Sequence, residues 1–281
     1  MLSVVIPTKN EAANIAACVL SFGDAVRRGE AEVVVVDNSS PDRTRAIAAE
    51  HGARVFEAGP ERCAQRNRGW REARGGWVLF SDADMVFPPE TVAEILSVCA
   101  SPGAADAYYV PEVRAGRGFR ARARNFERGF YNGTCIDGVR LVRREFLERT
   151  GGYDENLVAC EDWDLDRRLA AAGARMASLR GHLVHNEANM PLGRFLAKKA
   201  YYSASVGRYR AKWGDDAVMK RQFGILYRYL LVFVENGRWR RVLRHPLLFA
   251  GMMAERIAVG AVYLACRARP KDGDAIAGNM V

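Results

Sequence analysis

The sequence predicts an α/β fold in which helices flank a mostly parallel sheet and a C-terminal helical appendage follows. Two patterns predict it. The first half of the 281-residue chain alternates short β-branched runs with helical patterns, which is typical of βαβ units. Beyond about residue 190 the pattern becomes helical throughout, with aromatic and basic residues mixed. We therefore expect a sheet domain over residues 1–190 and a basic amphipathic helical region over residues 191–281.

Strands are expected where short apolar runs are bounded by turn residues. The run 4–6 is stopped by Pro7, and the run 77–81 follows the turn residues Gly75 and Gly76. The other strands are expected at residues 32–36, 54–56, 108–110, 136–143 and 181–184. Helical patterns separate most of these runs, at residues 10–26, 41–51, 62–74, 89–99, 144–150 and 162–172. The Arg-rich segment 114–128 is punctuated by glycine and is expected to be partly irregular.

The composition indicates a folded, basic protein. Hydrophobic residues make up 49% of the chain, enough for a sizeable core. Lysine and arginine number 42 against 33 aspartates and glutamates, giving a formal net charge of +9. Such a charge favours an anionic partner, namely a nucleotide, a phosphorylated lipid, an anionic membrane or a nucleic acid. Charge alone does not choose among them.

The cysteines and the N-terminus indicate a cytoplasmic protein. The 6 cysteines are scattered and show no zinc-ligand spacing, so we interpret them as reduced thiols. Residues 1–20 lack a basic region ahead of an apolar stretch, so we expect a first core strand there and no signal peptide.

The apolar run 247–265 is about as long as a membrane span, which needs roughly 20 residues. Its centre, however, holds Glu255 and Arg256, and a central charge pair is costly in hydrocarbon. We expect an amphipathic helix that lies in an anionic membrane interface or packs on the domain.

Two carboxylates, Asp82 and Asp84, follow the strand expected at residues 77–81. Side chains alternate along an extended strand, so Asp82 and Asp84 are expected to face one site. Their charges repel unless a cation lies nearby, and Mg²⁺ or Mn²⁺ favours carboxylate and phosphate oxygens. Ligands of open α/β sheets bind at the carboxyl ends of the strands. The motif therefore predicts a metal and phosphate site at the mouth of the sheet.

Four stretches together resemble the family 2 inverting glycosyltransferases, which have the Rossmann-like GT-A fold. In chain order they read VVIPTKNE, VVVDNSSPDRT, RCAQRNRGWREARGGWVLFSDAD and GGYDENLVACEDWDLDRRLAAAG. The resemblance covers roughly residues 1–185. It implies transfer of a sugar from a nucleotide-diphospho-sugar of the UDP or GDP type, assisted by Mn²⁺ or Mg²⁺.

The resemblance also implies roles for residues on the donor side. Metal binding would fall to Asp84 and Asp82, and Asp82 would also contact the nucleotide. Further nucleotide contacts are implied for Pro7, Thr8, Glu11, Asp37, Ser39, Arg66 and Asn67. In this family Asp37 would bond the base, which leaves uracil and guanine open. Met85 follows the metal motif where the family often has a polar or acidic residue.

On the acceptor side, Asp162 would be the catalytic base, with Glu161 beside it. His185 is either a further metal ligand or a structural histidine. Trp163 either stacks on a sugar or packs in the core, and Arg168 either contacts the acceptor or pairs with a carboxylate.

The acceptor is expected to be a hydroxyl, because an ionised phosphate acceptor requires no general base. It would belong to a glycan, a glycolipid, a lipid-linked glycan or a cell-surface polysaccharide precursor, met at the inner face of the plasma membrane. A polyprenyl-phosphate sugar synthase is the alternative, favoured by the arginines of 114–128. We expect no nucleic-acid partner, because aromatic residues are not interleaved with those arginines. A second subunit is left open.

Overall fold

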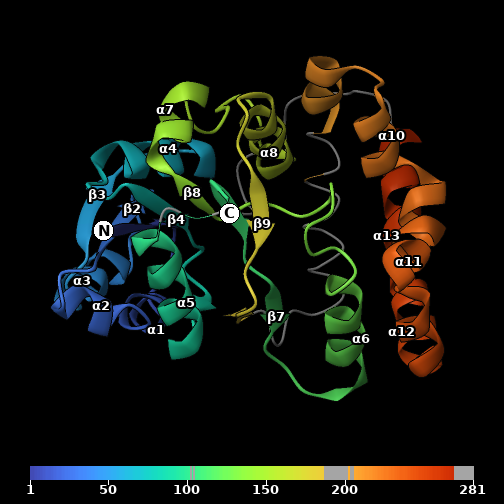
Figure 1. Cartoon of the computed structure of the whole chain (residues 1–281), viewed down its shortest axis with the longest axis horizontal. Coiled ribbons are helices and arrows are strands. Elements are labelled where there is room, and N and C mark those ends of the chain that lie inside the picture. The colour runs from blue at the N-terminus through green and yellow to red at the C-terminus, as the bar shows by residue number, and fades with distance from the viewer. Residues whose placement is uncertain (102, 104, 187–201, 203–205, 269–281) are drawn as a thin grey trace.

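The computed structural model describes residues 1–101, 103, 105–186, 202 and 206–268. It contains an α/β body and, beside it, a layer formed by the C-terminal helices (Figure 1). The predicted boundary at residue 190 falls outside the described residues, so the division into two domains stays a prediction.

The body is built on a seven-stranded sheet with the order β3-β2-β1-β4-β8-β6-β9. In chain order these strands are β1 (Leu2–Thr8), β2 (Ala31–Asp37), β3 (Arg54–Glu57), β4 (Trp77–Phe80), β6 (Ala107–Tyr109), β8 (Leu141–Arg143) and β9 (Met176–Ser178). β8 runs antiparallel to both neighbours, whereas the other pairs are parallel. The predicted mostly parallel sheet is thus confirmed. The pairing of Thr8 with Asp37 brings the ends of β1 and β2 to one edge.

Helices cover both faces of this sheet. One face packs against α1 (Ile15–Leu20), α2 (Gly23–Arg27), α3 (Thr44–Glu50) and α5 (Pro89–Ala100). The other packs against α4 (Arg62–Glu72), α7 (Arg144–Thr150) and α8 (Glu161–Ala171). Alternation along β1 explains this, because Val4 and Ile6 point to the first core and Val5 to the second.

A second, three-stranded sheet was not foreseen. Its order is β5-β10-β7, formed by β5 (Met85–Val86), β10 (Leu183–His185) and β7 (Glu112–Arg114). β10 runs antiparallel to β5, and this pairing sets His185 opposite Met85. The small sheet therefore carries the end of β10 to the residue that follows the Asp82-Ala83-Asp84 motif.

The segment 114–128 is partly irregular, as predicted: residues 115–117 form no helix or strand, and α6 (Gly118–Arg128) follows. The buried residues Ala123 and Phe126 of α6 pack against the C-terminal layer. Two local predictions are wrong. Of the strand expected at 136–143 only β8 forms, and the helix expected at 10–26 is two short helices. The short strand β9 was missed.

The C-terminal layer is helical, as predicted. It comprises α10 (Ala217–Phe223), the π-helix η1 (Tyr227–Leu231), α11 (Val232–Val234), the 3₁₀-helix η2 (Glu235–Gly237), α12 (Trp239–Arg244) and α13 (Pro246–Ala268). Its own core centres on Phe233 and Met252 and includes Phe126 and Phe130. None of the helices in the described part of the chain is long and apolar enough to cross a membrane.

The central charges of α13 face the protein. Glu255 lies 3.5 Å from Arg120 and 3.6 Å from Arg124 of α6. Arg256 is 6% exposed, lies 3.1 Å from Glu127, and contacts the ring of Phe233. The two charges that interrupt the apolar run are thus compensated by side chains of α6.

Gly69 of α4 tests the close packing of helix on sheet. A Cβ there would lie 2.3 Å from Val5 Cγ1, inside the core. We expect Gly69→Ala to lower the free energy of unfolding by about 1–3 kcal/mol, as overpacking does, measured by urea denaturation. Gly76→Ala is the control, because a Cβ there meets nothing within 4 Å. Equal stability of the two variants would contradict this packing.

Candidate active site

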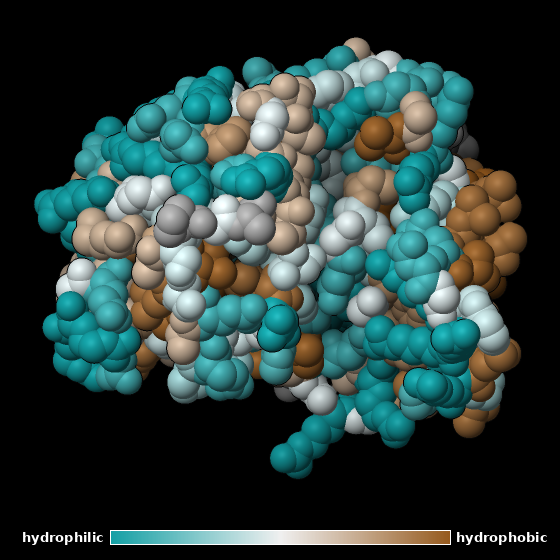
Figure 2. Space-filling view, in the orientation of Figure 1, coloured by the Kyte–Doolittle hydropathy of each residue, from teal (hydrophilic) through white to brown (hydrophobic). Residues whose placement is uncertain are grey.

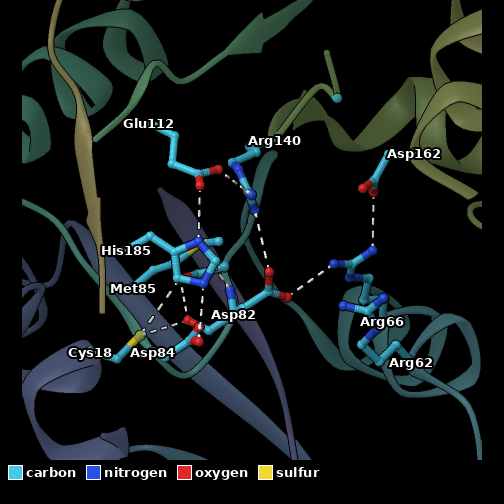
Figure 3. A network of polar contacts seen from close by, with 12 residues as sticks. Cys18, Arg62, Arg66, Asp82, Asp84, Met85, Glu112, Arg140, Asp162 and His185 are labelled. Carbon is cyan, nitrogen blue, oxygen red and sulfur yellow. Dashed lines mark hydrogen bonds and ion pairs between the residues drawn. The ribbon is translucent and has the colours of Figure 1, made fainter. Parts of the chain in front are cut away.

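The motif Asp82-Ala83-Asp84 lies in a turn between β4 and β5. The Met85 amide donates to the Asp82 carbonyl at 3.1 Å, which closes this turn. The expectation that strand alternation aligns the two carboxylates is therefore wrong. Instead each carboxylate has its own partners, His185 for Asp84 and arginines for Asp82 (Figure 3).

His185 lies between two carboxylates. Its Nε2 is 3.0 Å from Asp84 Oδ2, and its Nδ1 is 3.0 Å from Glu112 Oε1 (Figure 3). Burial opposes charge on the ring, but the hydrogen bonds to Asp84 and Glu112 raise the pKa of His185 to about 9. Burial also opposes the charge of Glu112, yet His185, Arg128 and Arg140 hold the pKa of Glu112 well below its ordinary value.

Two arginines hold Asp82. Arg66 Nη2 lies 3.0 Å from Asp82 Oδ1, and Arg140 Nη1 lies 3.9 Å from Asp82 Oδ2. Burial would raise the pKa of Asp82, but these two guanidinium groups lower it far below its ordinary value. Arg140 also lies 3.7 Å from Glu112, so the groups around Asp82 and those around His185 form one network (Figure 3).

Arg66 connects that network to α8. Its Nη1 lies 3.1 Å from Asp162 Oδ1 and 3.6 Å from Glu161 Oε1, while its guanidinium stacks on Tyr153 at 5.0 Å. The side chain is only 3% exposed. A single buried cation therefore bridges the Asp82 turn and the start of α8.

The two acids that open α8 differ in exposure. The Asp162 side chain is 40% exposed, whereas that of Glu161 is 8% exposed. Burial, reinforced by the charge of Asp162, raises the pKa of Glu161 against the influence of Arg62 and Arg66. Asp162 also accepts a hydrogen bond from the Tyr153 hydroxyl at 3.3 Å. Of the pair, Asp162 is the carboxylate that an incoming molecule reaches.

Behind Asp162 the chain passes close at Gly138. A Cβ at this glycine would lie 2.9 Å from the Asp162 Cβ. Asp162 can occupy its position because residue 138 is a glycine and has no Cβ to clash with it.

The donor-side residues lie at the ends of β1 and β2. Asp37 is fully buried and accepts from the Thr8 hydroxyl at 2.8 Å and from the Ser40 amide and hydroxyl at 2.7 Å each. Pro7 belongs to β1, and the Ser39 hydroxyl bonds Glu57. Burial raises the pKa of Glu11, and the charges of Asp84 and Asp82 raise it further. Glu11 is therefore close enough to Asp82 and Asp84 for their charges to affect it.

Asn67 has its bonding groups engaged within the protein. Its side-chain nitrogen donates to the Tyr153 carbonyl and to Glu155, both at 2.8 Å, and its oxygen accepts from the Tyr153 amide and the Trp70 indole. These bonds tie α4 to the loop before α8. Its predicted nucleotide contact stays a prediction.

Trp163 and Arg168 have structural partners. The Trp163 ring packs edge-on against Phe223 and Tyr209, with centroids 5.6 and 6.2 Å away. Arg168 donates to Asp164 at 2.7 Å and to the Thr150 carbonyl at 2.8 Å. These contacts favour the packing and carboxylate-pairing alternatives left open for the two residues.

Sequence reasoning missed Glu112, Arg140 and Arg62. Glu112 and Arg140 complete the network around His185 and Asp82, and Arg62 lies 3.4 Å from Glu161 and 2.9 Å from the Tyr202 hydroxyl. A charged residue next to an apolar run, as in YYVPE, was the available signal for Glu112. Their partners, however, are 73, 58 and 99 positions away.

The side chains of Asp84 and His185 fit a divalent cation whose remaining ligands come from a bound substrate. Within the residues described, no group of three or more His, Cys, Asp or Glu side chains is placed to hold a metal ion. Asp84 and His185 offer one oxygen and one nitrogen ligand 3.0 Å apart. Mg²⁺ and Mn²⁺ sites commonly use one or two protein ligands together with substrate phosphates. These side chains therefore form no complete metal site. Asp84 and His185 provide two ligands, which substrate phosphates would have to complete.

Comparison with family models places the chain among known proteins. Residues 3–151 match the model described as "Glycosyl transferase family 2", and residues 135–223 match "Glycosyltransferase like family 2". A dolichol-phosphate mannosyltransferase of Pyrococcus furiosus is 32% identical over 101 residues, which span 34% of this chain and 29% of that relative. The match therefore covers less than a third of the relative's length.

Two solved structures are similar in fold. A mannosyltransferase of Pyrobaculum calidifontis, in complex with GDP-Man and Mn²⁺, gives a TM-score of 0.56 at 22% identity over 92% of this chain and 75% of its own. The glucosyl-3-phosphoglycerate synthase of Mycobacterium tuberculosis, in complex with Mn²⁺, UDP and phosphoglyceric acid, gives 0.52 at 20% identity, covering 77% and 80%. This likeness bears out the predicted GT-A fold.

Asp166, on the same helix as Asp162, generates a prediction on pH. It is buried, accepts from the Val139 amide at 3.0 Å, and has its pKa raised well above the ordinary value by burial. Because the unfolded chain ionises this group near pH 4 and the folded chain does not, folding loses stability as pH rises above 4.

We expect Asp166→Asn to be more stable than the parent at pH 8, by roughly 1 kcal/mol or more. The amide oxygen keeps the acceptor while the ionisation is removed, so the advantage should shrink toward pH 4. Urea denaturation across this range measures it. An advantage that stays constant with pH would contradict the assignment.

Proposed function

The chain belongs to glycosyl transferase family 2 and is a glycosyltransferase; from this premise we propose that it is metal-dependent and transfers a sugar with inversion from a nucleotide-diphospho-sugar to an acceptor hydroxyl. The observation that carries this proposal is the bridge made by Arg66. One guanidinium lies 3.0 Å from Asp82 of the donor-side turn and 3.1 Å from Asp162 of the acceptor-side helix. The residues proposed to bind the leaving diphosphate and the residue proposed to activate the acceptor would thus lie on either side of Arg66.

On the donor side, Asp84 and His185 would hold Mn²⁺ or Mg²⁺. When bound, that cation would neutralise charge developing on the leaving diphosphate. Pro7, Thr8, Glu11, Asp37 and Ser39 lie at the ends of β1 and β2 or just beyond them, and we assign them to the nucleoside. Asp37 would reach the base only if it shares or exchanges the bonds it receives from Thr8 and Ser40. Whether that base is uracil or guanine is left to experiment.

On the acceptor side, Asp162 is the proposed general base. The acceptor oxygen attacks the anomeric carbon from the face opposite the diphosphate, the new oxygen–carbon bond forms as the carbon–phosphate-oxygen bond breaks, and Asp162 takes the hydroxyl proton. The N-terminal end of α8 stabilises negative charge there. Arg66 and Tyr153 orient the carboxylate through Oδ1, which leaves Oδ2 for the acceptor.

Asp162 suits this role better than Glu161. It is five times as exposed, 40% against 8%. Glu161 is instead enclosed with Arg62 and Arg66, where it would balance the arginine charges and support its neighbour.

The alternative is a phosphate acceptor, as in a polyprenyl-phosphate sugar synthase. The partial match to a dolichol-phosphate mannosyltransferase favours it. Arginines of α6, which were the sequence argument for it, are engaged by protein carboxylates: Arg120 and Arg124 by Glu255, and Arg128 by Asp137. We therefore retain the hydroxyl acceptor, on a glycan, glycolipid or lipid-linked glycan.

We further propose that the enzyme works at the cytoplasmic face of the plasma membrane, where a lipid-anchored acceptor would be presented. Residues 1–190 would form the catalytic domain, and the basic helical region 191–281 would provide the attachment.

Replacing Asp162 tests the proposed base. Asp162→Asn keeps the shape but cannot accept the proton, so we expect kcat to fall about 10²–10⁴-fold with little change in donor affinity. The rate of transfer is measured from the release of the nucleoside diphosphate. Donor affinity is measured by calorimetry. Asp215→Asn, at an exposed position outside the site, is the matched control. An Asp162→Asn variant with parental kcat would remove this residue from the role.

Nucleotide binding tests the proposed donor site. UDP, GDP, CDP and dTDP are titrated calorimetrically with and without Mn²⁺. We expect one nucleotide to bind at least tenfold more tightly with the metal, and Asp84→Ala to lose that gain, because the remaining His185 is a single ligand. The Asp215→Ala variant should keep it. If no nucleotide responds to the metal, the proposed donor site is refuted.

A further inference from the structure

Among the described side chains of α13, the outward face carries no charge beyond Pro246. Beyond Pro246, the exposed positions in the described part of this helix recur every three or four residues, as one helical stripe does, and all are apolar: Leu247, Ala250, Ala254, Ile257, Ala261 and Leu264. Leu247, Ile257 and Leu264 are 75%, 62% and 65% exposed. The solvent side of a surface helix ordinarily carries polar residues, whereas α13 is apolar on this side as well as on the buried side that holds Met252.

Neighbouring segments extend this face. The exposed residues of 225–234 are also all apolar: Ile225, Leu226, Leu230, Leu231 and Val234. In α12, Trp239 and Leu243 are 46% and 70% exposed and lie four residues apart, on one side of that helix. Figure 2 shows hydrophobic residues gathered along the outer edge of the C-terminal helices, at the right of the view. We call these residues, from Ile225 to Leu264, the apolar face.

A small hollow adjoins the apolar face. A cavity of about 290 Å³ opens between α6 and α13, next to Ala254, and is lined by Phe119, Ala123, Gly251, Ala258 and the Arg120 and Glu255 side chains. Phe119 itself is 52% exposed. Apolar surface therefore continues around the edge of α13 toward α6.

The surroundings of the apolar face are basic. Between Ala217 and Ala268 the sequence has nine lysines and arginines but only two acids. Both acids are engaged within the protein, Glu235 by Arg221 and Arg238, and Glu255 by α6. Exposed Arg240 and Arg244 each follow an apolar residue of α12, so they lie beside the stripe. Arg240 also stacks on the Trp239 ring at 5.5 Å.

We propose that the apolar face docks on an anionic lipid bilayer, with α12 and α13 lying in the interface and Arg240 and Arg244 at the level of the headgroups. The chemistry matches: an apolar helix side enters the boundary of the acyl chains, tryptophan favours that depth, and arginines meet lipid phosphates. A second copy of the chain fits worse, because a two-fold contact would bring the same arginines together.

This inference deepens the proposed location of the enzyme but does not depend on sugar transfer. Its test therefore uses vesicles alone, and its failure is distinct from failure of the proposed reaction. The full chain is sedimented with phosphatidylcholine vesicles, with and without phosphatidylglycerol. We expect binding to the anionic vesicles that weakens as salt is added.

Two pairs of substitutions test the face. Leu247→Gln with Ile257→Gln should lower vesicle binding at least about tenfold by removing apolar contact, whereas Leu20→Gln, an exposed leucine of α1, should not. Arg240→Gln with Arg244→Gln should lower binding to anionic vesicles roughly tenfold or more and leave the weaker binding to phosphatidylcholine unchanged. These side chains are exposed, so unfolding midpoints should match the parent.

Two results would overturn the proposal. The first is vesicle binding that is absent or that neither pair of substitutions changes. The second is a concentration-dependent dimer, seen by analytical ultracentrifugation, that the Leu247→Gln and Ile257→Gln pair dissolves; the face would then belong to a second copy of the chain.

Discussion

The buried guanidinium of Arg66 is the interaction on which the rest of the site depends. Taking a cation out of water is costly unless anions compensate it, and Arg66 is compensated from two directions, by the Asp82 turn and by the start of α8. The same contacts compensate three carboxylates, Asp82, Glu161 and Asp162, because each lies close to the positive charge of Arg66. α4 thus joins sheet and acceptor helix electrostatically, and Asn67, one residue on, does so through neutral hydrogen bonds.

The small sheet supplies the second constraint. β10 pairs with β5 in antiparallel register, which brings His185 opposite Met85 and so beside Asp84. β7 lies on the other side of β10 and contributes Glu112, whose carboxylate faces His185 and three arginines, Arg114, Arg128 and Arg140. Such an outer partner would orient His185 in its proposed role as a metal ligand. The position of one side chain at the metal motif thus rests on strand pairings between residues about 100 and 70 positions apart.

Local patterns in the sequence predict the large sheet, but they predict only part of the candidate site. β-branched runs and glycine turns predicted most strands of the large sheet, and the ends of those strands predicted where Asp37, Asp82 and Asp84 lie. The turn that separates Asp82 from Asp84 was not predictable, because it depends on a bond to Met85 and on pairing with β10. Glu112 and Arg140 escaped for the same reason: their burial is acceptable only beside charges brought in from elsewhere.

The C-terminal layer departs from the usual arrangement of side chains, because α13 is apolar on its exposed side as well as in its core. In the sequence, Glu255 and Arg256 are evidence against a membrane span. In the structure, Glu255 pairs with arginines of α6 and Arg256 pairs with Glu127 of the same helix. Because Glu255 and Arg256 face inward, the exposed positions beyond Pro246 among the described side chains of α13 are apolar. A helix with this distribution gains little from water on its outer side, whereas a lipid surface would bury that side and leave the inner ion pairs intact. The charges that argue against α13 crossing a bilayer are thus the ones that would orient it on the proposed bilayer surface.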